Sequence, residues 1–276
     1  MDYNLGFVFT NYNNSLDTIK TVESIFEINE LNRFIIIIVD NNSNIYQVKI
    51  LQDLKIKFPE VHIILNNENL GYFNGLNIGL NFIREKHFVF KYLVIGNNDL
   101  YFPKNFYMNI LLNEEPFKKF PVISPNIVTE DGFFQNPHVI KEISKFREII
   151  YDLYFYNNTI AKLIKKIAKV TNFFTDRSDE KFNNKSQIIY QGHGSCYILT
   201  PKFFDHFDEL FAPTFLMGEE FFLSWQLKQK DLELFYESNV KIIHKWHASI
   251  NNVPPKKIWE IAKVSHKVYR KYIKII

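Results

Sequence analysis

Short hydrophobic runs alternate with longer segments of helical periodicity over the first hundred residues. The runs predict four strands, at Leu5–Thr10, Phe34–Val39, Val61–Leu65 and Tyr92–Gly96. Every residue of Phe34–Val39 is apolar, which is typical of a parallel strand buried on both faces. The intervening segments predict helices, one with Ser15 as its N-cap, one that Pro59 closes and one over Leu70–Glu85. This alternation predicts an α/β fold with an open, mostly parallel sheet.

The second half of the chain is less regular. It predicts a strand at Val122–Val128, a strand pair or bent strand over Gln187–Leu199, a helix at Glu219–Lys230, and short strands at Leu232–Tyr236 and Val240–Ile243. The Lys-rich segment 141–186 predicts a helical insertion. We therefore expect one domain over residues 1–250 that contains this insertion, followed by a C-terminal helical extension over residues 251–276.

Composition and charge exclude several classes of protein. The 276 residues carry 33 Lys and Arg against 30 Asp and Glu, and a net charge of +3 is too balanced for nucleic-acid binding through bulk charge. A single cysteine, Cys196, excludes an internal disulfide framework. The apolar runs are far shorter than the roughly 20 residues that span a bilayer, and the first is too short for a signal peptide. We expect a cytoplasmic protein, with peripheral contact to the inner face of the plasma membrane left open.

Each of the first four predicted strands ends in a polar cluster. The carboxyl ends of parallel strands meet at one edge of the sheet, where ligands bind. Asp99, in the cluster Asn97-Asn98-Asp99, could ligate a divalent cation that bridges a diphosphate, or it could cap a helix beginning near Pro103. Asp40, after the second strand, could bind a base or a ribose hydroxyl, or it could only form a turn.

The third predicted helix begins with regularly spaced glycines and asparagines. The glycines are Gly71, Gly75 and Gly79, and the asparagines are Asn69, Asn74 and Asn77. Asn side chains that enter a helix N-terminus suit a phosphate or a ribose, although close helix packing explains the glycines equally well. The spacing differs from the Gly-x-Gly-x-x-Gly fingerprint, which disfavours a dinucleotide-dependent oxidoreductase.

Two further groups of titratable residues lie in the second half. Glu219 and Glu220 follow Gly218 in an aromatic-rich segment, where one carboxylate could face a cleft and act as a general base with a raised pKa. An acidic pair that favours the helix dipole is the alternative. His244 and His247 follow a predicted strand and could bind a metal or a phosphate, but no cysteine lies nearby to complete a zinc site.

The order of these motifs resembles the family 2 glycosyltransferases of the GT-A fold, especially the bacterial branch that builds surface polysaccharides and is often labelled rhamnosyltransferase-like. The motifs in order are Thr10-Asn11-Tyr12-Asn13, Asp40-Asn41-Asn42-Ser43, Asn69-Leu70-Gly71-Tyr72 with Gly75, Asn77 and Gly79, Asn97-Asn98-Asp99, Gly192-His193-Gly194, Gly218-Glu219-Glu220 and Val240–His244. The resemblance covers Leu5 to Ser249 without the insertion. It implies a Rossmann-like open mixed sheet flanked by helices.

The resemblance also implies a role for each matching residue. The residues that would border the nucleotide are Thr10, Asn11, Tyr12, Asp40, Asn69, Gly71, Asn77 and Asn98. Asp99 and His244 would hold a divalent cation, Mn²⁺ or Mg²⁺. Glu220 would be the catalytic base, and the residues that would face the acceptor or the donor sugar are Gly192, His193, Gly194, Glu219 and Trp225.

Two positions depart from the family pattern. Asn97 replaces the first Asp of the Asp-x-Asp metal motif, which leaves one carboxylate fewer for the cation. Glu220 replaces the usual Asp, which moves the carboxylate by one methylene. The implied reaction is the inverting transfer of a sugar from a nucleotide-diphospho sugar, with UDP or dTDP favoured, to a hydroxyl of a glycan or lipid-linked glycan.

Other functions compete with this prediction. A non-catalytic nucleotide-sugar or glycan-binding module with a decayed centre is consistent with Asn97, whereas Asp99, Glu220 and His244 argue against it. A nucleotidyltransferase would need a Gly/Arg/Lys-rich loop early in the chain, and Asn11–Asn14 is not one.

The insertion could contact a membrane. Its apolar residues Ile160, Leu163, Ile164 and Ile167 lie on one helix face, and Lys162, Lys165, Lys166 and Lys169 occupy the rest. Ile258 to Ile276 is similar in character. Such a basic amphipathic helix could lie on an anionic membrane, or it could be a solvated face over ordinary packing.

Overall fold

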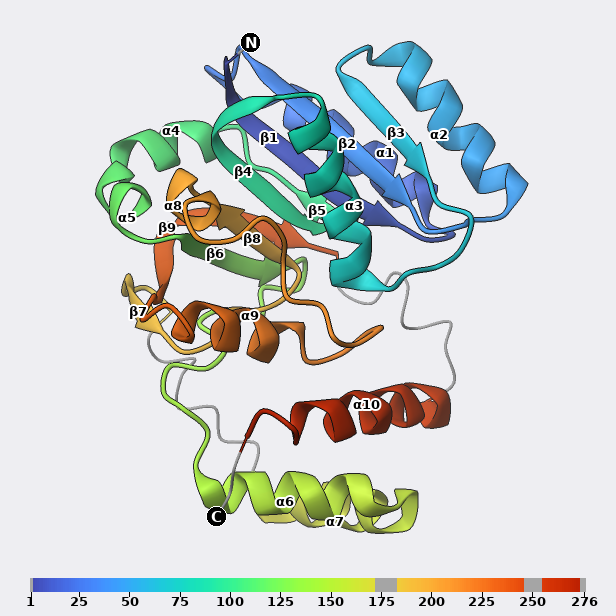
Figure 1. Ribbon diagram of the computed structural model, residues 1–276, viewed down its shortest axis with the longest axis vertical. Coiled ribbons are helices and arrows are strands. Elements are labelled where there is room, and N and C mark those ends of the chain that lie inside the picture. Colours follow the sequence, from blue (N-terminus) through green and yellow to red (C-terminus); the bar gives the residue numbers. More distant parts are fainter. Residues whose placement is uncertain (1, 172–182, 246–254, 274–276) are drawn as a thin grey trace.

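The structure is a computed structural model that describes residues 2–171, 183–245 and 255–273, without the side chains of residues 2, 168–171 and 255. A nine-stranded mixed sheet runs through the molecule and carries helices on both faces (Figure 1). Its strand order is β3-β2-β1-β4-β8-β6-β9-β5, and β7 pairs with β9. This arrangement confirms the predicted α/β fold with an open mixed sheet.

The first half of the sheet is parallel and the second half is mixed. The strands are β1 (Asp2–Asn11), β2 (Phe34–Asp40), β3 (Val61–Leu65), β4 (Val89–Asn97), β5 (Leu100–Tyr101), β6 (Val122–Thr129), β7 (Gln187–Ile189), β8 (Cys196–Leu199) and β9 (Leu234–His244). β1 pairs in parallel with β2 and β4, so the carboxyl ends of β1, β2 and β4 meet at one edge of the sheet. β8 runs antiparallel to β4 and β6, whereas β6 and β9 are parallel.

Helices cover the two faces in separate groups. One face carries α1 (Ser15–Phe26), α2 (Ile45–Lys57), α4 (Phe106–Leu112) and α5 (Glu114–Lys119), and the other carries α3 (Tyr72–Glu85), α8 (Pro201–Phe204) and α9 (Glu219–Lys228). The remaining helices are α6 (Lys145–Tyr156), α7 (Asn158–Thr171) and α10 (Pro255–Tyr269). α10 lies between α9 and the α6–α7 pair (Figure 1).

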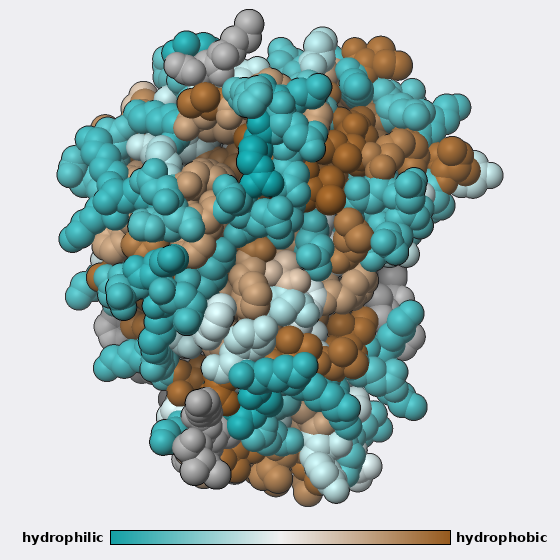
Figure 2. Space-filling model, viewed as in Figure 1, coloured by the Kyte–Doolittle hydropathy of each residue, from teal (hydrophilic) through white to brown (hydrophobic). Residues whose placement is uncertain are grey.

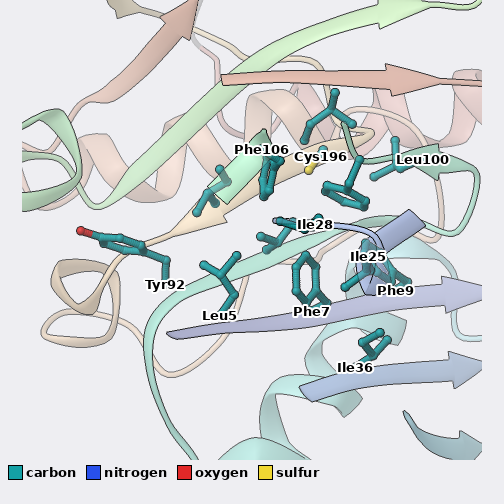
Figure 3. Close-up of a cluster of buried hydrophobic side chains, with 14 of the residues drawn as sticks. Leu5, Phe7, Phe9, Ile25, Ile28, Ile36, Tyr92, Leu100, Phe106 and Cys196 are labelled. Atoms are coloured by element: carbon teal, nitrogen blue, oxygen red, sulfur yellow. The ribbon is translucent and has the colours of Figure 1, made fainter. Parts of the chain in front are cut away.

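Alternation along β1 assigns its side chains to two hydrophobic cores. Phe7 and Phe9 point to the face that α1 and α4 cover, where they meet Ile25, Phe106 and Cys196 (Figure 3). Val8 points to the opposite core. Because burial raises the pKa of the Cys196 thiol, this side chain is a neutral part of the core rather than a nucleophile.

The start of α1 differs from the prediction. Asn14, rather than Ser15, is the N-cap residue, and Ser15 is the first residue of the helix. The Ser15 hydroxyl donates to the Gln47 carbonyl oxygen at 3.0 Å, so it ties α1 to α2 instead of capping its own helix. Leu16, the next residue, is exposed.

The second half shows three further differences. The strands predicted at Leu232–Tyr236 and Val240–Ile243 form one strand, β9, which stays continuous across a bulge where its register with β6 shifts. The strands within Gln187–Leu199 do not pair with each other, because β7 pairs with β9 and β8 with β4 and β6. The helix expected near Pro103 is α4, which begins at Phe106 with Asn105 as its N-cap residue, so Asp99 does not cap it.

Aromatic side chains connect the C-terminal helix to the sheet domain. Phe221 of α9 packs edge-on against Tyr269 of α10, with ring centroids 4.4 Å apart. Within the described ranges, no helix is both long and apolar enough to cross a membrane.

Candidate active site

A buried network of polar side chains joins the carboxyl ends of β1, β2 and β4. The Asn11 amide donates to Asp40 Oδ1 at 2.6 Å, and Asn11 Oδ1 accepts from the Asn98 amide at 2.8 Å. Asp40 also accepts from the Ser43 hydroxyl and the Ser43 backbone N–H, so it closes the turn that the sequence offered as the alternative. All three side chains are buried. The network therefore fixes this edge of the sheet, and direct contact of these three residues with a nucleotide stays a prediction.

Two neighbours of this network are accessible from the edge. Thr10 is half-buried at the end of β1, and the Tyr12 side chain is 48% exposed. An exposed aromatic ring beside a rigid polar edge can stack against a nucleobase, as the prediction for Tyr12 requires.

Asp99 and His244 meet at the end of β4 and β9. Asp99 Oδ1 lies 3.2 Å from His244 Nε2, and both side chains are buried. On the other side of the ring, His244 Nδ1 lies 2.7 Å from Gln135 Oε1. Since an amide oxygen can only accept, Nδ1 carries the proton, and Nε2 faces the carboxylate with a lone pair or a second proton.

This geometry fits a cation ligand pair. Asp99 Oδ1 is buried and has no hydrogen-bond partner, although it faces the imidazole as an ion-pair partner. The Asn97 amide lies 3.5 Å from His244 Nε2, where it can donate to an unprotonated nitrogen. A carboxylate oxygen beside an imidazole lone pair is unfavourable unless a proton or a cation lies between them, and a carboxylate oxygen is a typical ligand of Mn²⁺ or Mg²⁺. No three His, Cys, Asp or Glu side chains converge on a metal position in the described part of the chain.

The N-terminus of α3 is joined to the segment before α9. Gly71 has φ +84°, and a Cβ there would come within 1.8 Å of the Phe215 carbonyl oxygen. Asn77 donates to the Leu210 carbonyl oxygen and accepts from the Leu210 N–H, so its amide is fully engaged. Asn69 accepts from the Gly71 N–H at 3.0 Å. Direct contact of Asn69, Gly71 and Asn77 with a ribose or diphosphate stays a prediction.

Helix packing explains the other two glycines of this motif. A Cβ on Gly75 would come within 2.8 Å of Thr10 and Asn41 side-chain atoms, and a Cβ on Gly79 within 2.3 Å of Val8. The glycines therefore let α3 lie directly on β1.

Glu220 is held against the loop that precedes β8. Its Oε1 accepts from the Gly194 N–H at 3.1 Å. A Cβ on Gly194 would come within 2.6 Å of the same carboxylate oxygen, so glycine is needed for this approach. His193 packs its ring 5.8 Å from the His244 ring, and Gly192 accepts from the Tyr197 hydroxyl. The loop therefore connects Glu220 to the Asp99–His244 pair.

Glu219 and Glu220 occupy different environments. Glu219 is 6% exposed and accepts from the Met217 N–H at 3.0 Å. Burial, together with the nearby Glu220 carboxylate, raises the pKa of Glu219 to about 8. The sequence analysis expected the raised pKa on the carboxylate that acts as the base, whereas in the structure the raised pKa belongs to Glu219. A protonated Glu219 removes one negative charge from beside Glu220.

Trp225 lies farther back on α9. Its ring packs 5.1 Å from Phe211 and 4.9 Å from Tyr272. This contact explains the aromatic cluster seen in the sequence as packing between α9 and the C-terminal extension. Contact of Trp225 with an acceptor stays a prediction. His247 lies outside the described residues.

Three site residues were not singled out by the sequence analysis. The Tyr72 hydroxyl donates to the Gly194 carbonyl oxygen at 2.6 Å, and burial, with nearby carboxylates including Glu219, Glu220 and Asp99, raises its pKa. Gln135 orients His244, and Lys245 forms an ion pair with Asp17 at 2.7 Å. Tyr72 stands inside the glycine motif and could have been found there, whereas Gln135 and Lys245 carry no local signal.

Comparison with known proteins gives a family for the first half of the chain. Residues 7–159 match the model of the family described as glycosyl transferase family 2. No curated protein matches the chain.

Solved structures with the same fold are longer proteins. One is GalNAc-T7 with UDP, GalNAc and Mn²⁺, at a TM-score of 0.59 and 14% identity, covering 88% of this chain and 44% of that one. Another is the mannosyltransferase PcManGT from Pyrobaculum calidifontis in complex with GDP-Man and Mn²⁺, at a TM-score of 0.54 and 12% identity, covering 97% of this chain and 63% of that one. This chain therefore spans 44% and 63% of the length of these two relatives, and the likeness shows the fold.

Proposed function

This chain belongs to glycosyl transferase family 2, and we propose that it transfers a sugar from a nucleotide-diphospho sugar to a hydroxyl of a glycan or lipid-linked glycan, with inversion. The observation that supports this most directly is the arrangement of Asp99 and His244 beside the loop that holds Glu220. In this proposal residues 1–250 form the transferase domain, with 141–186 as an insertion and 251–276 as an extension.

The donor would bind at the carboxyl edge of β1, β2 and β4. Thr10 and Tyr12 are the accessible side chains there, while Asn11, Asp40 and Asn98 hold the edge in place. A UDP- or dTDP-sugar is the donor that we favour. The two structural relatives carry UDP and GDP-Man, which supports a nucleotide diphosphate in general.

Asp99 and His244 would hold a divalent cation, Mn²⁺ or Mg²⁺, in this proposal. When bound, the cation would neutralise the charge that develops on the leaving diphosphate. Gln135 fixes the His244 tautomer, so Nε2 faces the Asp99 oxygen that has no hydrogen-bond partner.

Glu220 would act as the general base. Its carboxylate is half-buried and is held by one backbone N–H, which leaves lone pairs for the proton of an acceptor hydroxyl. As the proton moves to Glu220, the hydroxyl oxygen attacks the anomeric carbon, and the bond to the diphosphate oxygen breaks with its electron pair. A single displacement of this kind inverts the anomeric configuration. Because Glu219 would be protonated, no second negative charge would lie beside the Glu220 carboxylate.

The biological setting that we favour is bacterial surface polysaccharide synthesis, such as a capsule or a lipopolysaccharide, in the rhamnosyltransferase-like branch. The support for this part is the order of the sequence motifs.

Thermal unfolding with nucleotides tests the proposal first. The protein would be melted with UDP, dTDP, GDP and CDP, and with their common sugars, each with and without Mn²⁺. We expect one nucleotide series to raise the melting temperature, and Mn²⁺ to increase that rise. Stabilisation without a metal effect would remove Asp99 and His244 as cation ligands. A folded sample that responds to none of these compounds would contradict the proposed donor site.

Turnover separates this enzyme from a binding module of the same fold. Asn97 supports the binding module, because it supplies one carboxylate fewer. Hydrolysis or transfer of the donor that stabilises the protein would identify an enzyme, whereas tight binding with no turnover on any offered glycan would favour the module.

A further inference from the structure

The helix α6 has three faces, of which one packs against α10 and a second faces a cavity beside α7. Glu148, Asp152 and Phe155 face α10, where Glu148 accepts from the Tyr269 hydroxyl and Asp152 pairs with His266 and Arg270. Phe155 stacks on the His266 ring. A second face, which carries Ile150 and Tyr154, lines a cavity together with Ile164 of α7. These contacts hold α6 firmly in one rotational setting.

The third face of α6 is apolar and exposed. It carries Phe146, Ile149, Leu153 and Tyr156, whose spacing of three and four residues forms a continuous stripe along the helix. Phe146 is 61% exposed and Tyr156 is 71% exposed. Leu163 of α7 is exposed as well. Figure 2 shows hydrophobic residues at the end of the molecule where Figure 1 places α6 and α7.

The same two helices carry exposed cations, and the acidic groups of α6 face α10. Among the described side chains of α6 and α7, the exposed cations are Lys145, Arg147, Lys162, Lys165 and Lys166. The acids in the sequence of these two helices are Glu148 and Asp152, and both are bonded to α10. The α6–α7 pair therefore presents exposed cations as well as an exposed apolar stripe.

We infer that the α6–α7 pair docks the protein on an anionic phospholipid bilayer. Basic residues are attracted to the negative surface of the bilayer, and a row of aromatic and aliphatic side chains can enter the boundary between headgroups and acyl chains. A second copy of this chain fits the surface less well, because the same cations would face each other across the contact. The inference concerns binding alone and is independent of the proposed sugar transfer.

Docking at this surface would orient the active site. α10 lies between α6 and α9, and α9 carries Glu219 and Glu220. The packing of Tyr269 on Phe221 links the docking surface to the helix that bears the proposed base. A membrane-bound acceptor could therefore be presented from a fixed side.

Vesicle flotation tests the inference with the full chain. The probes are vesicles of phosphatidylcholine with an equal part of phosphatidylglycerol, and vesicles of phosphatidylcholine alone. We expect binding to the first and far weaker binding to the second. Lys162→Glu/Lys165→Glu/Lys166→Glu should weaken partition about a hundredfold or more, from about fivefold for each lost cation. Phe146→Ser/Leu153→Ser should also weaken binding, and this loss should depend less on salt concentration than the loss caused by the Lys→Glu changes.

Matched changes on the opposite end of the molecule serve as controls. Lys20→Glu/Lys49→Glu/Lys55→Glu makes the same charge change on α1 and α2, and Ile45→Ser/Ile56→Ser removes exposed apolar groups from α2. Both controls should bind like the wild type. Membrane docking is excluded if the folded wild-type protein fails to float with anionic vesicles. It is also excluded if the control variants weaken binding as much as the variants in α6 and α7. A dimer in solution that buries Leu153 and ignores vesicles would assign the surface to a second copy instead.

Discussion

The Asp99 carboxylate and the His244 imidazole face each other across 3.2 Å, and Gln135 holds the far side of the imidazole at 2.7 Å. Asp99 lies between β4 and β5, and His244 ends β9, so two distant segments supply the pair. A third residue fixes which nitrogen faces the carboxylate. This arrangement supports the proposed cation site, in which Gln135 would orient His244.

Removing the orienting partner should weaken cation binding without removing a ligand. We expect Gln135→Leu to lower the affinity for Mn²⁺ about ten- to a hundredfold, because His244 loses the acceptor that sets its tautomer. Asp99→Asn should remove the Mn²⁺ effect altogether. Thermal shifts in UDP or dTDP against Mn²⁺ concentration measure both changes. An unchanged Mn²⁺ dependence in both folded variants would show that the cation binds elsewhere.

Replacing the proposed base should separate chemistry from donor binding. Glu220→Gln keeps an oxygen that can accept from the Gly194 N–H, so the loop should stay in place. We expect kcat to fall about a hundred- to ten-thousand-fold, with nucleotide-induced stabilisation retained. Donor turnover and thermal shift are measured on the same sample. Near-normal turnover would exclude Glu220 as the base.

The sequence predicted the frame of this site better than its contacts. The apolar runs located β1 to β4, and the polar residues after them were expected at one edge because parallel strands share their direction. Gln135 and His244 lie 109 residues apart, and Tyr72 and Gly194 lie 122 apart. No local pattern encodes such pairs, because they depend on how β8 and β9 pack against the first half. The prediction of two separate strands in place of β9 was wrong for the same reason, because the continuity of β9 depends on its pairing with β6.

The Tyr72 hydroxyl should position the loop that holds Glu220. It donates to the Gly194 carbonyl oxygen, while the Gly194 N–H donates to Glu220. Tyr72→Phe keeps the ring and removes this bond, which should cost about 1 kcal/mol of stability. We expect kcat to fall while KM for the donor changes little. Tyr46→Phe, at an exposed ring, is the control. Equal kinetics in Tyr72→Phe and the wild type would assign Tyr72 a packing role.

Glu219 should make the protein less stable as the pH rises. Its pKa is about 8 in the folded chain, against an ordinary value of 4.5, so the folded state holds a proton that the unfolded state has lost between these values. This stability is present below about pH 4.5 and is lost as the pH rises through 8, by a few kcal/mol in order of magnitude. Glu219→Gln should remove this pH-dependent loss, so the stability of the variant relative to the wild type should increase between pH 6 and pH 9. The exposed Glu68→Gln is the control, and a wild-type–variant difference that stays constant with pH would contradict the assignment.

Two glycines with nearly equal positive φ angles allow the cost of backbone strain to be measured apart from the cost of a steric clash. Gly71 has φ +84° and Gly132 has φ +85°, but a Cβ on Gly71 would lie 1.8 Å from the Phe215 carbonyl oxygen, whereas nothing lies within 4 Å of one on Gly132. Gly132→Ala should therefore cost about 1 kcal/mol, from the positive φ alone.

We expect Gly71→Ala to cost several kcal/mol, since backbone must move at both α3 and the segment before α9. Urea unfolding measures the two variants side by side. A Gly71→Ala variant too unstable to purify would agree with this expectation if Gly132→Ala, prepared in parallel, folds normally. Equal losses in the two variants would mean that the Phe215 segment yields easily.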